Sequence, residues 1–128
     1  MKGYILNIEK ETLENENYRK VLYTAKNSQL VLMTIQPGDE IGEEVHELDQ
    51  FIRIEAGKAT VILDGVEHAL EEDWAVVIPA GMNHNVINTG HEPLRLYSIY
   101  SPAEHKDGTI HATKADEVEE HFDGITTE

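Results

Sequence analysis

The sequence contains no cysteine. This absence excludes a disulfide framework and any metal site built on thiolates, so a bound metal would need nitrogen and oxygen ligands. Apolar residues make up 40% of the 128 residues, but no run of them approaches the roughly 18 residues that a membrane-spanning helix needs. The first residues also lack the apolar stretch of a signal peptide. We therefore expect a cytoplasmic protein.

Basic residues are scarce as well. Ten lysines and arginines stand against 25 acidic residues, which gives a net charge of −15. Such a charge repels a phosphate backbone and an anionic membrane surface, so we expect neither nucleic acid nor membrane as a partner. Solubility is the simplest explanation of the charge. An anionic small-molecule substrate would have to be held by a metal or by a local lysine or arginine.

Helical periodicity is nearly absent before the last part of the chain. Short runs of alternating apolar and polar residues are instead separated by turn signals at roughly 8 to 12 residues, as in a sandwich or barrel of antiparallel strands. The sequence therefore predicts an all-β fold in a single domain, residues 1–128. The expected strands are residues 4–8, 19–24, 29–35, 50–55, 59–63, 66–70, 74–78, 84–88 and 94–100.

Two local signals mark the ends of these elements. Asp64-Gly65 suits the positive φ angles of a type I′ turn and should form the tip of a hairpin. Residues 101–128 differ in character from the barrel core, about residues 19–100, and we expect them to form an appendage. Within it, Thr113 and Asp116 resemble a capping box, which predicts a short helix to about Phe122.

Four side chains in two segments form a candidate metal site. Glu44 and His46 are two residues apart, so on an extended strand they project to the same face. Gln50 follows four residues later, and its amide oxygen can complete the cluster. His84 comes after a turn that would carry it back across the barrel interior. We therefore predict that Glu44, His46, Gln50 and His84 bind one divalent metal ion.

The spacing of these residues resembles the two motifs of the cupins over about residues 30–100. The first motif is represented by Gly38, Glu44-Val45-His46, Gln50 and Gly57, and the second by Pro79-Ala80-Gly81, His84 and Asn88. The resemblance implies a double-stranded β-helix, or jelly roll, with a metal at its centre. It also implies, commonly, a dimer.

The sequence departs from the usual cupin pattern at three positions. Glu44 stands where the first histidine usually stands, Gln50 replaces the usual glutamate, and Asp73 occupies the opening glycine position of the second motif. The ligand set keeps a charge of −1, with two histidines, one carboxylate and one amide. Zn, Mn, Fe and Ni all remain open as the metal.

Each ligand also has a plain structural interpretation. Glu44 can extend an exposed charge pair with Glu43, Gln50 can hydrogen-bond backbone, and His84 can be an ordinary core histidine. Their joint occurrence at motif spacing favours a metal site. A buried carboxylate is also costly unless a cation pairs with it or it is protonated.

Three functions are compatible with such a site. The first is a Lewis-acid enzyme, isomerase-like or lyase-like, that acts on a small sugar or keto acid. The ligand types loosely resemble those of phosphomannose isomerases, in a different order. The second is an Fe(II)-dependent dioxygenase, because two histidines and one carboxylate leave open positions. The third is a non-catalytic module that binds a small ligand.

Candidate catalytic bases lie outside the ligand set. His105 and His111 in the appendage can fold over the barrel mouth, and Tyr97 belongs to the last strand. If Gln50 faces inward, alternation places Phe51 outward, where an exposed ring favours a homodimer.

Overall fold

The computed structural model describes all residues 1–128, and it consists mainly of strands arranged in two sheets. Six strands pair in the order β6-β3-β8-β2-β1-β9. They are β1 (Arg19–Thr24), β2 (Gln29–Ile35), β3 (Asp49–Ala56), β6 (Ala75–Ile78), β8 (Leu94–Ser101) and β9 (Ile110–His111). A smaller sheet contains β4 (Lys58–Leu63), β5 (Val66–Glu71) and β7 (His84–Asn88), in the order β5-β4-β7.

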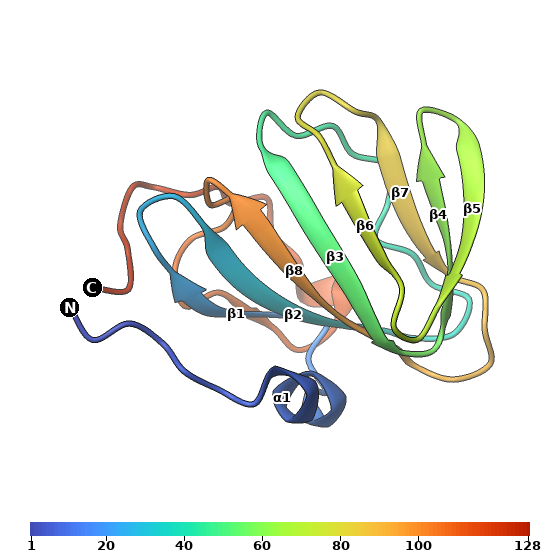
Figure 1. Ribbon diagram of the computed structural model, residues 1–128, viewed down its shortest axis with the longest axis horizontal. Helices are drawn as coiled ribbons and strands as arrows, with labels where there is room; N and C mark the ends of the chain where they lie inside the picture. Colours follow the sequence, from blue (N-terminus) through green and yellow to red (C-terminus); the bar gives the residue numbers. More distant parts are fainter.

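The core lies between the two sheets, which face each other as the two walls of a jelly roll (Figure 1). All strand pairs within the sheets are antiparallel. One apolar cluster joins Ile52 and Leu96 of the larger sheet to Val61 and Val86 of the smaller one. The all-β fold and the strands expected from residue 19 onward are confirmed.

The hairpin predicted at Asp64-Gly65 is also confirmed. Leu63 is paired with Val66, so the two residues between them form the turn. Asp64 has φ 46° and Gly65 has φ 83°, as a type I′ turn requires.

The strand predicted at residues 4–8 is wrong. A helix, α1 (Ile8–Glu14), begins there instead, and the side chain of Asn7 accepts a hydrogen bond from the backbone of Lys10 at 3.1 Å. Glu9 and Glu11 in the first turn also favour a helix, because negative charge is stabilised at a helix N-terminus. The short apolar alternation before Asn7 was therefore a misleading signal.

The helix predicted to extend to Phe122 is also wrong. The capping box of Thr113 and Asp116 forms, but it opens only a single 3₁₀ turn, η1 (Lys114–Asp116). The chain becomes extended at Glu117, with φ −61° and ψ 128°. There the carboxylate of Glu117 pairs with Arg19 at 2.6 Å, so a contact with the barrel competes with continuation of the helix.

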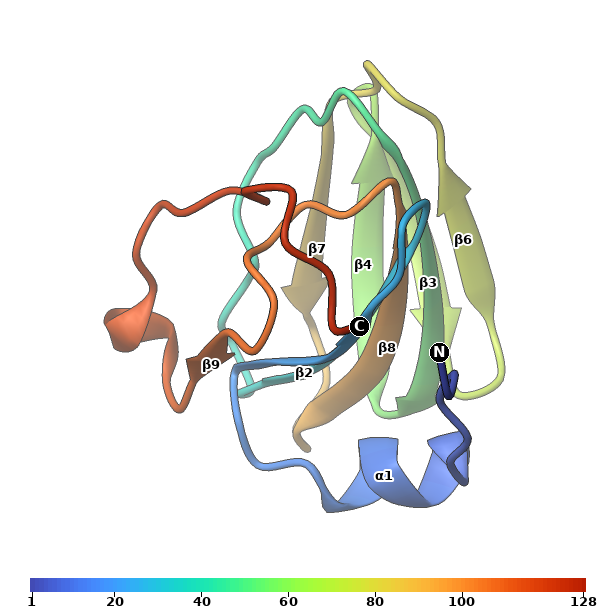
Figure 2. The same cartoon turned by 90° about the vertical axis from the view of Figure 1, so that its left-hand side faces the viewer.

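The C-terminal part of the chain, residues 101–128, packs along one side of the barrel (Figure 2). Strand β9 within it pairs with β1 and extends the larger sheet. The side-chain oxygen of Gln29 accepts hydrogen bonds from the backbone N–H groups of Glu104 and His105 at 3.3 and 3.0 Å. These contacts hold the beginning of the segment against the barrel.

The outer face of the larger sheet carries aromatic side chains. The rings of Phe51 and Tyr97 lie 6.3 Å apart, and nearby strand β6 exposes Val77. Phe51 faces outward as alternation required, and the homodimer expected from it stays a prediction. The single α-helix is too short to cross a membrane.

Candidate metal centre

The backbone places Glu44 directly beside His84, the first residue of β7. Each residue donates its N–H to the carbonyl of the other, and both hydrogen bonds measure 2.9 Å. This pair is a bridge outside the regular strands. It joins the loop that follows β2 to the edge of the smaller sheet, and so brings the two motif segments together.

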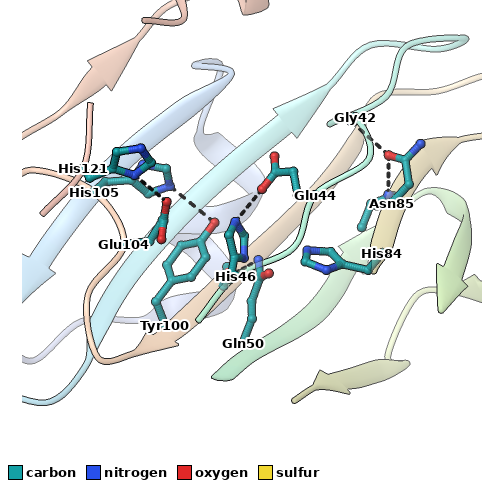
Figure 3. A network of polar contacts seen from close by, with 12 residues as sticks. Gly42, Glu44, His46, Gln50, His84, Asn85, Tyr100, Glu104, His105 and His121 are labelled. Carbon is teal, nitrogen blue, oxygen red and sulfur yellow. Dashed lines mark hydrogen bonds and ion pairs between the residues drawn. The ribbon is translucent and has the colours of Figure 1, made fainter. Parts of the chain in front are cut away.

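The side chains of Glu44, His46 and His84 converge from these segments (Figure 3). They offer three ligand atoms that all lie within 4.8 Å of one another. Nε2 of His46 is 2.6 Å from Oε2 of Glu44, and the two imidazole rings are 5.0 Å apart between centroids. The three residues therefore form a group that can hold a metal ion.

His84 is oriented as a ligand would be. Its Nδ1 lies 2.9 Å from the carbonyl oxygen of Met82, and a carbonyl can only accept, so Nδ1 carries the proton. This leaves Nε2 with a free lone pair for a cation. Metal-binding histidines characteristically donate their second nitrogen in this way, which fixes both the tautomer and the ring orientation.

Gln50 lies beside His46 and is almost completely buried, with 4% of its surface exposed (Figure 3). Its amide nitrogen donates to the hydroxyl of Ser98 at 2.9 Å. Its oxygen Oε1 is buried and has no hydrogen-bond partner, and the same holds for Nδ1 of His46. A buried acceptor without a partner costs about 1–3 kcal/mol, so Oε1 of Gln50 has unused capacity for a hydrogen-bond donor or a cation.

These residues fit a divalent metal ion with nitrogen and oxygen ligands. Burial opposes the charged form of His46, but the hydrogen bond and negative charge of Glu44 outweigh it and raise the pKa of the imidazole. A proton and a metal ion therefore compete for this site, and metal affinity should increase with pH.

A pocket of about 800 Å³ opens beside the cluster. Its walls come from β1, the loop that carries the cluster and the C-terminal segment. The lining residues are Arg19, Glu44, Val45, His46, Glu47, Glu104, His105, Glu117, Val118, Glu119, Glu120 and His121. The ligand group thus borders a space large enough for a small molecule.

Of the three expected catalytic bases, His105 lies at this pocket. Its Nε2 is 3.4 Å from the hydroxyl of Tyr100, whose ring centroid lies 5.9 Å from that of His46. Burial lowers the pKa of His105 to about 3, with Arg19 contributing, so the imidazole is neutral at pH 7. Burial also raises the pKa of Tyr100, which keeps its hydroxyl protonated.

The structure does not bring the other two expected bases to the pocket. His111 is buried on β9, where its Nδ1 lies 3.2 Å from Nη1 of Arg19, and it does not line the pocket. Tyr97 lies on the outer face of β8, because its neighbours Leu96 and Ser98 are buried and face inward. Strand alternation alone would have placed Tyr97 outside.

Sequence reasoning missed Arg19, which lines the pocket although only 3% of its surface is exposed. A signal for it was present. Arg19 shares its strand face with the core residue Val21, so a charged residue stands at an interior position of an alternating strand.

Comparison with known proteins agrees with this fold. The family model described as "Cupin domain" matches residues 31–100. The chain belongs to the cupin family.

The similarity of this cupin to individual proteins extends beyond the matched domain. It is 45% identical over 124 residues to YrkC, an uncharacterized protein of Bacillus subtilis (strain 168). The aligned residues cover 91% of this chain and 67% of YrkC. The crystal structure of BH2720 from Bacillus halodurans superposes with a TM-score of 0.88 at 44% identity, over 90% of this chain and 92% of that one. Polyketide synthase CurC of Streptomyces cyaneus is 32% identical over 81 residues, 62% of this chain and 53% of CurC.

Proposed function

We propose that this cupin is a metal-dependent enzyme, isomerase-like or lyase-like, that acts on a small oxygenated substrate such as a sugar or keto acid. The observation that carries the proposal is the convergence of Glu44, His46 and His84 within 4.8 Å, with Glu44 and His46 lining a pocket of about 800 Å³. Three protein ligands leave positions open on a divalent ion. A substrate in the pocket has direct access to them.

A divalent ion at this site would polarise a carbonyl or hydroxyl oxygen of the substrate as a Lewis acid. Residues of the protein supply the positioning of the ligands and the proton transfer. The backbone pair of Glu44 and His84 fixes the ligands before substrate arrives. His105 lines the pocket, with its Nε2 3.4 Å from the hydroxyl of the buried Tyr100, and we assign to His105 the proton that moves during the reaction.

The name of one relative supports a carbonyl-bearing substrate. CurC is a polyketide synthase protein, and polyketides are chains of carbonyl groups. That likeness covers 62% of this chain, so it supports the class of substrate and not a particular reaction.

Elemental analysis tests the metal, and isotope exchange tests the chemistry. Protein purified without added metal should contain about one divalent ion per chain, and His46→Ala and His84→Ala should both lose it. Keto acids incubated with the loaded enzyme in D₂O should acquire deuterium next to the carbonyl, as read by NMR. Failure to bind Zn, Mn, Fe or Ni even in excess would favour the non-catalytic binding module.

An Fe(II)-dependent dioxygenase is the second candidate, because the three clustered ligands are two histidines and one carboxylate. The metal dependence of turnover separates the two functions. Oxygen consumption that requires iron would support the oxygenase. Retained activity with redox-inert zinc would support the isomerase or lyase.

A further inference from the structure

Arg19 is a buried cation at the pocket that the proposed reaction does not yet use. We propose that Arg19 binds the carboxylate of an anionic substrate, and that Glu117 occupies the position of that carboxylate in the present structure. This inference rests on the proposed function, since it places the anion in the pocket beside the metal ligands. It narrows the substrate to a small acid.

The charges around the pocket point to this role. Arg19 is the one lysine or arginine among the lining residues, while Glu44, Glu47, Glu104 and the glutamates of residues 117–121 supply negative charge. In a protein of net charge −15, an acidic ligand would be repelled from this space without Arg19. The acidic composition led us to expect that a metal or a local lysine or arginine holds an anionic substrate. Arg19 is the residue at the pocket that can do so.

The hydrogen bonding of Arg19 is incomplete. Its Nη1 is 2.6 Å from the carboxylate of Glu117 and 3.2 Å from His111, but its Nε is buried and has no acceptor. The hydroxyl of Tyr18, whose ring lies 5.2 Å from the guanidinium, is also buried without a partner. A guanidinium has five donors arranged to bind a carboxylate through two of them. Arg19 thus has N–H donors free for a second carboxylate, or for one placed to accept two hydrogen bonds.

Glu117 itself is easily displaced. Its side chain is 35% exposed, against 4% for that of Arg19. Residues 118–121, which follow it, make no backbone hydrogen bonds. Side-chain pairs hold them, His121 with Glu104 at 3.0 Å and Lys106 with Glu120 at 3.9 Å. The carboxylate of this pair is open to solvent while the guanidinium is buried, so a substrate carboxylate can replace Glu117 without leaving Arg19 unpaired.

The experiment compares succinate with monomethyl succinate on the zinc-loaded protein by calorimetry. Both probes can reach the metal through one carboxylate, but only succinate has a second one for Arg19. Wild type should bind succinate about tenfold more tightly than the ester, which corresponds to about 1.4 kcal/mol. Glu117→Gln frees Arg19 and should raise the affinity for succinate about tenfold further. The affinity for the ester should stay unchanged.

Glu119→Gln is the matched control, because it removes one negative charge from the same segment at a side chain that is 89% exposed. It should raise the affinity for succinate far less than Glu117→Gln does, because it lowers the negative charge of the pocket without touching Arg19. Arg19→Gln should abolish the difference between succinate and ester. If that variant does not fold, Glu117→Gln still decides: unchanged or weaker succinate binding means that Glu117 is a structural partner of Arg19, and it overturns the inference.

Metal content measured on the same samples separates the two proposals. Full metal content with equal binding of succinate and ester would refute the anion site and leave the proposed function standing. No metal, but succinate binding that responds to Glu117→Gln, would refute the proposed function and keep Arg19 as the anion site.

Discussion

Glu44 and His84 are 40 residues apart in the sequence and are hydrogen-bonded to each other through both backbone N–H groups at 2.9 Å. Residues paired in this way project their side chains to the same face of the sheet. One carboxylate and one imidazole are therefore set side by side by main chain alone. The geometry of the candidate metal site does not depend on either side chain.

Loss of the carboxylate at Glu44 should weaken metal binding strongly while leaving the fold intact. We expect Glu44→Gln to lower zinc affinity by at least about 100-fold, because loss of an outer partner of a metal ligand already costs about 10–100-fold. Competition against a chromogenic chelator measures the change. Glu43→Gln is the control, since Glu43 is exposed and accepts a hydrogen bond from Asn83 at 2.7 Å. Equal affinities of the two variants would contradict the assignment of Glu44.

Gln50→Glu should tighten metal binding about tenfold, because a carboxylate is a stronger ligand than a neutral amide. One of its oxygens can accept from Ser98, and the other replaces the unpartnered Oε1. Without metal, the same variant should unfold at lower urea, because it places a carboxylate at a buried position. Affinity that stays flat or falls would show that Gln50 is not a ligand.

Gly57 in the first cupin motif has a backbone role that can be measured. It has φ +97°, and a Cβ there would lie 3.0 Å from both Cα of Leu94 and the carbonyl oxygen of Pro93. We expect Gly57→Ala to reduce the free energy of unfolding by about 3 kcal/mol. Gly65→Ala, at φ +83° with no atom within 4 Å, should cost only about 1 kcal/mol. Equal losses in urea denaturation would mean that the contact with β8 can relax.

His105 should make the protein less stable in mild acid. Burial lowers its pKa in the folded protein to about 3, below the ordinary histidine value of 6.5. Between these values the unfolded chain binds more protons, so the free energy of unfolding falls as the pH falls through that window.

Urea denaturation of the metal-free protein at pH 7.5 and 5.0 tests this effect. Between the two pH values, the free energy of unfolding of wild type should fall by about 1 kcal/mol more than that of His105→Asn. This figure allows for solvent screening of the partly exposed ring. Groups that titrate in both proteins, such as His46, cancel in the comparison. Identical losses would show that His105 is protonated freely in the fold.

The sequence predicted most of the barrel because short apolar runs, some of them clearly alternating as in β3 and β8, are separated by turn residues. The N-terminal error has a local cause. Residues 4–8 show the same short pattern as several true strands, so the pattern alone could not decide, and the cap at Asn7 was the better signal. The C-terminal error has a tertiary cause, since Glu117 leaves the helical path for a contact with Arg19, which is about 100 residues away along the chain.

The candidate site was likewise predicted only in part. Motif spacing predicted that Glu44, His46 and His84 would meet, because the spacing reflects the barrel itself. Position in the chain could not show that His105 reaches the pocket while His111 does not. That difference depends on how the C-terminal segment crosses the barrel, which is set by contacts such as those of Gln29.

The loop between β2 and β3 has a further consequence for experiment. It runs beside β7 without becoming a strand, and its amides at Ile41 and Glu44 donate to Val86 and His84 at 2.9 Å. An ion bound by Glu44, His46 and His84 would cross-link this loop to β7 and reduce its opening. Hydrogen–deuterium exchange at these two amides would then slow on metal binding. Occupancy of the site could be followed residue by residue before any substrate is known.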